Sequence, residues 1–84
     1  MSYALLILPR AERELASLDS SAYEPVKKKI YSLALDPRPP GCRKLRDHPA
    51  WRVRVGDYRI IYEVDDTART VTVVRVGHRK EIYR

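Results

Sequence analysis

The sequence has little cysteine, which limits the disulfides it can form and indicates the redox state of its compartment. Cys42 is the one cysteine among 84 residues, so the chain cannot close an internal disulfide, as suits a reducing cytoplasm. Cys42 follows Pro39, Pro40 and Gly41 in a loop, with neither histidine adjacent to it in sequence, and we interpret it as incidental rather than as a nucleophile. The sequence has no run of about 18 apolar residues, and the apolar run 3–8 is too short for a signal peptide. We therefore expect a cytoplasmic protein with no membrane partner.

Several familiar catalytic patterns are also missing. There is no cysteine and histidine cluster with zinc spacing, no glycine-rich phosphate loop, and no Ser-His-Asp signature that we can assemble. Asp65 and Asp66 form the one acidic pair, and they lie in a turn, where aspartate is common for backbone reasons. We expect no metal and no cofactor, so an enzyme of this sequence would work with its own side chains.

What the chain does contain is positive charge. The formal net charge is +6 and the isoelectric point is near 9.8. Acidic residues outnumber basic ones slightly over residues 10–24, whereas bases dominate over residues 27–59. Such an excess predicts a polyanionic partner, either a nucleic acid or an acidic protein. We expect residues 1–84 to form one domain whose core is marginal at this size, so a partner that covers apolar surface would stabilise it.

The first half of the chain predicts one strand and two helices. The apolar run 3–8 is typical of a strand covered on both faces, and Pro9 can open a helix directly after it. A second helix is expected over residues 21–35, with Pro25 in its first turn, where a missing N–H matters little. The first helix has its apolar stripe at Ala11, Leu15 and Leu18.

The second half predicts strands. The expected strands cover residues 43–46, 51–55, 58–64 and 70–76. Gly56-Asp57 favours a tight hairpin between the middle two, and Gly77 allows a bend or bulge after the last. The links between these late strands are short, so neighbouring strands must run antiparallel as a meander. The first strand of the chain must pair with this same sheet, and the two helices lie between it and the meander in sequence. The predicted fold class is therefore α+β, β-α-α-β-β-β(-β), with an antiparallel-rich sheet and two helices packed on one face.

Arginines recur along these strands at even spacing. Because side chains alternate along a strand, Arg52 and Arg54 share one face, about 7 Å apart from a rise of roughly 3.3 Å per residue. That spacing is close to the separation of successive phosphates on an RNA strand. Each arginine taken singly could simply cover the solvent face of a sheet. Together with Arg59, Arg79 and Tyr83, they favour a functional site.

RNA cleavage is a metal-free reaction that suits these residue types. The RNA's own 2′-hydroxyl attacks the phosphate, so the protein need not supply a nucleophile. Arginines placed around the phosphorane oxygens stabilise the additional charge through bidentate hydrogen bonds. A general base must activate the 2′-hydroxyl, and a general acid must protonate the leaving 5′-oxygen.

Three stretches resemble a known family, the RelE-type toxins of bacterial and archaeal toxin–antitoxin modules. They are residues 44–46 (KLR), 51–62 (WRVRVGDYRIIY) and 76–83 (VGHRKEIY), and the order of elements also agrees. The resemblance implies a toxin that enters the A site of the 70S ribosome, beside 16S rRNA, and cleaves mRNA there. It also implies a cognate antitoxin that neutralises the toxin, with operator DNA contacted only indirectly through that antitoxin.

The resemblance also assigns roles to individual residues. Basic positions that bind RNA or stabilise the transition state are Arg46, Arg52, Arg54, Arg59 and Arg79, with Lys44 and Lys80 in the same RNA-binding stretches. Tyr83 matches a tyrosine near the C-terminus that orients or activates the 2′-hydroxyl.

The sequence departs from the family pattern at two positions. The best-known members carry lysine where this chain has Arg52 and Arg54, and arginine does not release its proton. His78 and Tyr83 remain as proton carriers, and His78 is equally compatible with a structural role. Two alternatives stay open. The related ParE-type toxins inhibit DNA gyrase by binding, and a degenerate toxin would only bind its antitoxin.

Overall fold

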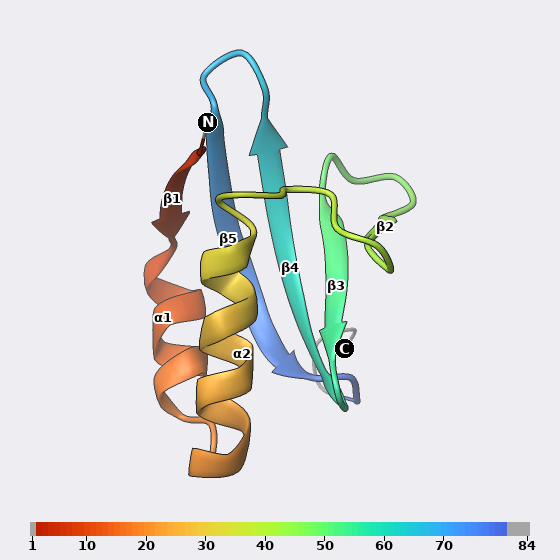
Figure 1. Ribbon diagram of the computed structural model, residues 1–84. Helices are drawn as coiled ribbons and strands as arrows, with labels where there is room; N and C mark the ends of the chain where they lie inside the picture. The colour runs from red at the N-terminus through yellow and green to blue at the C-terminus, as the bar shows by residue number, and fades with distance from the viewer. Residues whose placement is uncertain (1, 81–84) are drawn as a thin grey trace.

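The computed structural model describes residues 2–80, which form two helices and five strands (Figure 1). The elements, in chain order, are β1 (Ala4–Ile7), α1 (Pro9–Ala16), α2 (Ser20–Ser32), β2 (Arg43–Lys44), β3 (Trp51–Val55), β4 (Tyr58–Asp65) and β5 (Thr70–His78). The strands form one sheet in the order β1-β5-β4-β3-β2, in which β1 runs parallel to β5 and every other pair is antiparallel. This arrangement confirms the predicted α+β fold class and the return of the first strand to the sheet.

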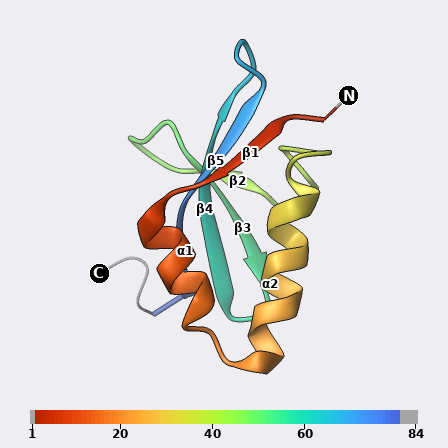
Figure 2. The same ribbon diagram turned by 90° about the vertical axis from the view of Figure 1, so that its left-hand side faces the viewer.

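Both helices lie on one face of the sheet. Figures 1 and 2 show α1 and α2 side by side in front of the sheet, and the opposite face carries no helix of the described chain. The core between these layers consists of the buried side chains Ala11, Leu15, Val26, Ile30, Leu33, Val53, Ile60, Tyr62, Val71, Val73 and Val76. Alternate residues of the strands therefore face the helices, and the residues between them face outward.

The second helix begins one residue earlier and ends sooner than the sequence predicts. The Asp19 carboxylate accepts a hydrogen bond from the Ala22 N–H at 3.0 Å, a side-chain cap typically worth about 1 kcal/mol. This cap fixes the start at Ser20, so Pro25 lies inside the helix and not in its first turn. The carbonyl that its N–H would have met belongs to Ser21, which is exposed, so water can solvate it.

Two further expectations about the strands are wrong. The first strand is not covered on both faces, because β1 is the outermost strand and Leu6 is 54% exposed. The bulge lies not at Gly77 but at Val74, since Ile61 pairs with Arg75 while Tyr62 pairs with Val73. The additional residue lets β5 keep Val73 and Val76 in the core despite their odd spacing.

The linker of residues 33–42 runs from α2 to β2 across the face of the sheet that carries the helices (Figure 1). The Tyr62 hydroxyl donates to the Pro37 carbonyl at 2.7 Å, and the Arg38 guanidinium lies 5.2 Å from the centre of the Trp51 ring. Trp51 also packs against the core. Burial raises the pKa of Tyr62 well above its ordinary value, so the hydroxyl stays a donor.

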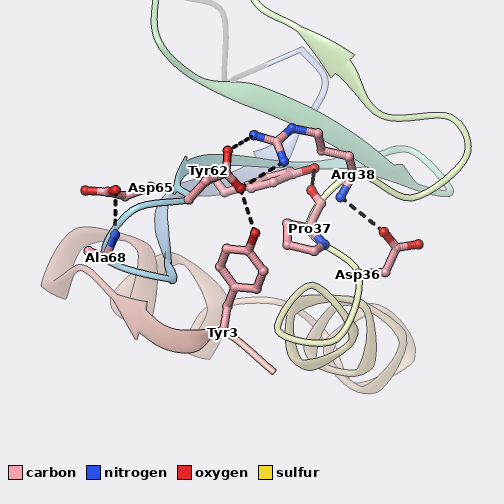
Figure 3. A network of polar contacts seen from close by, with 8 residues as sticks. Tyr3, Asp36, Pro37, Arg38, Tyr62, Asp65 and Ala68 are labelled. Carbon is pink, nitrogen blue, oxygen red and sulfur yellow. Dashed lines mark hydrogen bonds and ion pairs between the residues drawn. The ribbon is translucent and has the colours of Figure 1, made fainter. Parts of the chain in front are cut away.

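An exposed carboxylate ties this linker to the β4–β5 turn. Asp66 accepts two hydrogen bonds from Arg38, at 2.8 and 3.2 Å, and one from the Tyr3 hydroxyl at 2.6 Å (Figure 3). The Arg38 guanidinium, followed by the Tyr3 hydroxyl, lowers the pKa of Asp66 from 3.8 to about 2. Three segments far apart in the sequence therefore meet at one ionised group.

We expect Asp66 to make stability depend on pH in the acid range. Because folding lowers its pKa, its contribution is fully present above about pH 4 and is lost as the pH falls through 2. Asp66→Asn should lower the Tm at pH 7 and flatten the fall in Tm between pH 4 and pH 2. Asp47→Asn, a matched change at another exposed aspartate, should leave the Tm profile as it is. Parallel acid profiles for wild type and Asp66→Asn would contradict this role.

Candidate functional site

The face of the sheet away from the helices carries a ladder of arginines. In the β3–β4 pairing Arg54 lies directly opposite Arg59, and in the β2–β3 pairing Arg43 lies directly opposite Arg52. Residues that pair in this way have Cβ atoms about 4.5–5.5 Å apart on the same face. The structure therefore brings Arg52, Arg54 and Arg59 together as the sequence suggests, and it adds Arg43, which sequence reasoning missed.

The core on the other face holds these like charges opposite one another. Val53 pairs with Ile60, which pairs with Val76, and all three side chains are almost completely buried. A slip by one residue would expose this row, at roughly 1.5–3 kcal/mol for each side chain. Like charges directly opposite in a sheet destabilise it by a few tenths to about 1 kcal/mol. Core burial therefore outweighs the repulsion and keeps a concentrated positive charge on the open face.

Arg79 joins the end of this ladder through the backbone. Its N–H donates to the Asp57 carbonyl at 2.9 Å, so the chain after β5 is fixed to the β3–β4 hairpin turn. Gly56 in that turn has a φ of +59°, which suits glycine in a two-residue hairpin. Arg79 and Lys80 are both exposed, and they follow β5 at the same end of the sheet as Arg54 and Arg59. Tyr83 lies outside the described residues.

His78 lies on the other face of the sheet. It pairs with Tyr58, whose side chain packs against the core, and the two rings meet edge to face with centres 5.6 Å apart. Its Nδ1 accepts a hydrogen bond from the Lys80 N–H at 3.2 Å. The structure therefore does not bring His78 together with the arginines, and it gives the ring a packing and capping role at the end of β5.

The strand predicted over residues 43–46 is shorter in the structure, so Lys44 and Arg46 do not share one face of a strand. β2 ends at Lys44, because the Leu45 N–H turns back to the Ala50 carbonyl and Asp47 adopts a φ of 65°. Lys44 lies opposite Trp51, and its side chain is therefore directed to the face away from Arg52. Arg46 belongs to the loop that closes over the open face.

An apolar hollow of about 540 Å³ lies on the open face beside the arginine ladder. Its walls come from the loop of residues 45–50 and from β4 and β5. The lining residues are Leu45, Arg46, His48, Pro49, Ala50, Ile61, Glu63, Val74 and Arg75. Its floor exists because the bulge turns Val74 outward next to Ile61, an irregularity that no sequence signal indicates.

A second hollow, of about 450 Å³, brings two lysines of α2 to the ladder. Lys28 and Lys29 line it together with Arg54 and Val55. The structure places them beside Arg54, so the positive surface continues from the open face around the edge of β3.

A carboxylate of α1 fixes the C-terminal half of β5, which lies beyond the residues that pair with β1. Glu14 accepts from the Val76 N–H at 3.0 Å and from the Arg75 Nε–H at 3.0 and 3.2 Å. The ion pair is half-buried, and it satisfies a backbone donor that the sheet leaves open. Glu14 therefore holds the segment that leads to Arg79.

Within residues 2–80 no three histidine, cysteine, aspartate or glutamate side chains are grouped so that they could hold a metal ion. No helix in the same stretch is long and apolar enough to cross a membrane.

Comparison with known proteins identifies the family. Residues 5–83 match the sequence model of the ParE toxin of type II toxin–antitoxin systems (parDE). The chain is 35% identical to the mRNA interferase toxin RelE of Escherichia coli K12, over 99% of this chain and 92% of that protein. It is 52% identical to toxin RelG of Mycobacterium tuberculosis over 31 residues, which are 37% of this chain and 36% of that toxin.

A solved structure agrees with these three matches. The fold superposes on a chain of the toxin–antitoxin complex RelBE2 of Mycobacterium tuberculosis with a TM-score of 0.82 and 28% identity, covering 94% of this chain and 100% of that one. This chain therefore belongs to the RelE/ParE superfamily of type II toxin–antitoxin toxins.

Proposed function

We propose that this protein is a ribosome-dependent endoribonuclease, which cleaves mRNA in the A site of the 70S ribosome and so stops translation in the cytoplasm. The observation that carries the proposal is the arginine ladder of Arg43, Arg52, Arg54 and Arg59 on one open face. Similarity over almost the whole chain to a toxin named as an mRNA interferase supports the same activity. The mRNA and 16S rRNA would provide the polyanionic surface that the net charge of +6 favours.

In this proposal the RNA supplies its own nucleophile. The 2′-hydroxyl oxygen attacks the adjacent phosphorus, and the bond from phosphorus to the 5′-oxygen breaks, leaving a 2′,3′-cyclic phosphate and a 5′-hydroxyl. Arg52, Arg54, Arg59 and Arg79 stabilise the additional charge on the phosphorane. Their guanidinium groups remain protonated, so they act as charge clamps and not as bases.

Tyr83 is the residue to which we assign orientation or activation of the 2′-hydroxyl. It follows Arg79 by four residues, and Arg79 is fixed at the hairpin end of the ladder. Arg46 in the loop and Lys80 after β5 would bind the RNA on either side. The position of Lys44 on the other face gives it a part only in longer-range attraction.

Substitutions on the ladder test the charge-clamp role. Arg54→Ala should lower the single-turnover cleavage rate by roughly 10²–10³, by analogy with the loss of one oxyanion donor. Arg54→Lys keeps the charge but loses the planar fork, so it should retain part of the rate. Tyr83→Phe removes only a hydroxyl and should slow cleavage with binding almost intact. Arg13→Ala on the exposed side of α1 is the control. Cleavage near the wild-type rate by both Arg54→Ala and Tyr83→Phe would refute the site.

The position of His78 gives a second expectation. Because its Nδ1 accepts from Lys80 and its ring packs on Tyr58, His78→Gln should leave the pH dependence of the cleavage rate unchanged between about pH 5.5 and 7.5. A flattened profile in that range would instead show that His78 exchanges a proton during the reaction. Single-turnover rates measured on assembled ribosomes decide between the two results.

We also propose a cognate antitoxin as the protein partner. The solved RelBE2 structure is a toxin–antitoxin complex, and the small basic domain here exposes Leu6, Leu8, Tyr31 and Leu35. An acidic, amphipathic chain would neutralise the charge and cover apolar surface. Calorimetry with the product of the neighbouring gene should give a dissociation constant in the nanomolar range, and the Tm should rise as binding to the folded state requires. No heat and no change in Tm would contradict this partnership.

Inhibition of DNA gyrase is the second candidate, and the match to the ParE toxin model favours it. Adding the purified protein to a translating extract and mapping mRNA ends by primer extension separates the two. The proposed function predicts cuts within A-site codons and unaffected supercoiling by gyrase. Intact mRNA together with blocked gyrase would favour the ParE-like activity. Intact mRNA and active gyrase, with tight antitoxin binding, would leave a toxin homologue that only binds its antitoxin.

A further inference from the structure

The apolar hollow on the open face lies next to the arginine ladder and is not explained by phosphate binding. Ile61, in its floor, pairs directly with Arg52 across β3 and β4. A phosphate bound at Arg52 and Arg43 would therefore have its own nucleotide beside this hollow. Phosphate contacts fix the position of a nucleic acid strand, whereas contacts with the bases distinguish one sequence from another.

The hollow suits a flat, apolar ring. Leu45, Pro49, Ala50, Ile61 and Val74 provide its apolar walls, and about 540 Å³ lies between them. Ala50 and Ile61 are buried and pack together, with Leu45 against them, so this part of the wall is preformed. Single-stranded RNA is commonly recognised by bases that leave the stack and enter such pockets.

The polar side chains that line the hollow are Arg46, His48, Glu63 and Arg75, and Arg75 is already paired with Glu14. Among them, Glu63 and Arg46 carry complementary hydrogen-bonding groups. Glu63 comes from β4 and Arg46 from the loop, and both are exposed. Neither side chain forms a hydrogen bond or an ion pair with another residue of the described segment 2–80. A carboxylate only accepts hydrogen bonds and a guanidinium only donates them. The pair therefore fits a base edge that offers an amino group beside a ring or carbonyl acceptor.

We propose that this hollow binds one unstacked RNA base next to the cleaved phosphate and prefers bases with an exocyclic amino group to uracil. Cytosine, adenine and guanine offer an N–H₂ group to Glu63, whereas uracil presents a carbonyl at the position where cytosine has its amino group. The negative charge of Glu63 at the hollow favours an uncharged RNA base over the carboxylate of an acidic peptide, because Glu63 would repel that carboxylate. The inference rests on the proposed function, since it identifies a base subsite of the same active face.

A titration with 3′-CMP and 3′-UMP tests this preference without the ribosome, because these nucleotides differ mainly in one amino group against one carbonyl. Methyl resonances of Ile61 and Val74 in the full chain should shift with 3′-CMP, and 3′-UMP should bind at least about fivefold more weakly, the lower end for one good base contact. Glu63→Gln should remove the difference, because an amide can offer its carbonyl to cytosine or its N–H₂ to uracil. Glu12→Gln on exposed α1 is the matched control and should keep it.

Three results would overturn the inference. Methyl resonances of Ile61 and Val74 that ignore both nucleotides would exclude a base in the hollow. Equal affinity for 3′-CMP and 3′-UMP in the wild type would exclude the amino preference. Shifts of these methyl groups with the purified antitoxin, in a protein where neither nucleotide shifts them, would assign the hollow to the antitoxin instead.

The outcome can be separated from that of the proposed function. Ribosomal cleavage by a protein that binds both nucleotides equally would overturn the base preference and leave the nuclease intact. Selective binding of 3′-CMP by a protein that cuts no mRNA would support the base site and overturn the nuclease.

Discussion

The buried row that crosses the centre of the sheet determines the rest of the molecule. Val53, Ile60 and Val76 lie side by side against the helices, and their burial fixes the register of β3, β4 and β5. Since side chains alternate along each strand, this register also determines what the other face displays. Arg54 must then stand opposite Arg59, although two cations in this position repel each other. A face that accepts such repulsion is suited to a ligand that brings negative charge.

The contacts around the sheet hold the ends of this arrangement in place. Glu14 fixes β5 where β1 stops, and the Asp57 carbonyl fixes Arg79 to the hairpin. At the other end, Asp66 joins Arg38 and Tyr3, so the linker that crosses the sheet is attached to the β4–β5 turn. These contacts lie outside the ladder itself, and they hold the strands and turns that surround it. Preorganisation of this kind is what charge stabilisation in a transition state requires.

Much of the architecture follows from local sequence signals. The Gly56-Asp57 hairpin, the alternation in β3 and the helix after Pro9 each depend on a short-range rule, and each is present in the structure. The face of Lys44 could not be predicted, because it depends on where β2 ends and on its pairing with Trp51. The bulge at Val74 carries no glycine or proline signal, since it results from fitting Val73 and Val76 into one core.

The candidate site also contains some residues that local sequence signals group together and others that only the folded structure brings there. Arg52, Arg54 and Arg59 could be grouped from alternation and one hairpin, whereas Arg43 joins them only through the register of a two-residue strand. His78 was an even choice from sequence, because strand length alone does not reveal which face its ring takes after Gly77. Glu63 gave no signal at all, since a single exposed glutamate in a strand usually only meets solvent. Its significance appears when the loop of residues 45–50 closes beside it.

The central claim is that the RNA supplies its own nucleophile while the arginine ladder stabilises the charge. The most direct test places a single 2′-deoxynucleotide in the mRNA, at the position whose 2′-hydroxyl would attack, on ribosomes that hold this codon in the A site. The account predicts that the protein leaves this mRNA intact at that bond, and that it cuts the all-ribose mRNA to a 2′,3′-cyclic phosphate. Equal cleavage of both mRNAs would contradict it, because the nucleophile would then come from the protein or from water.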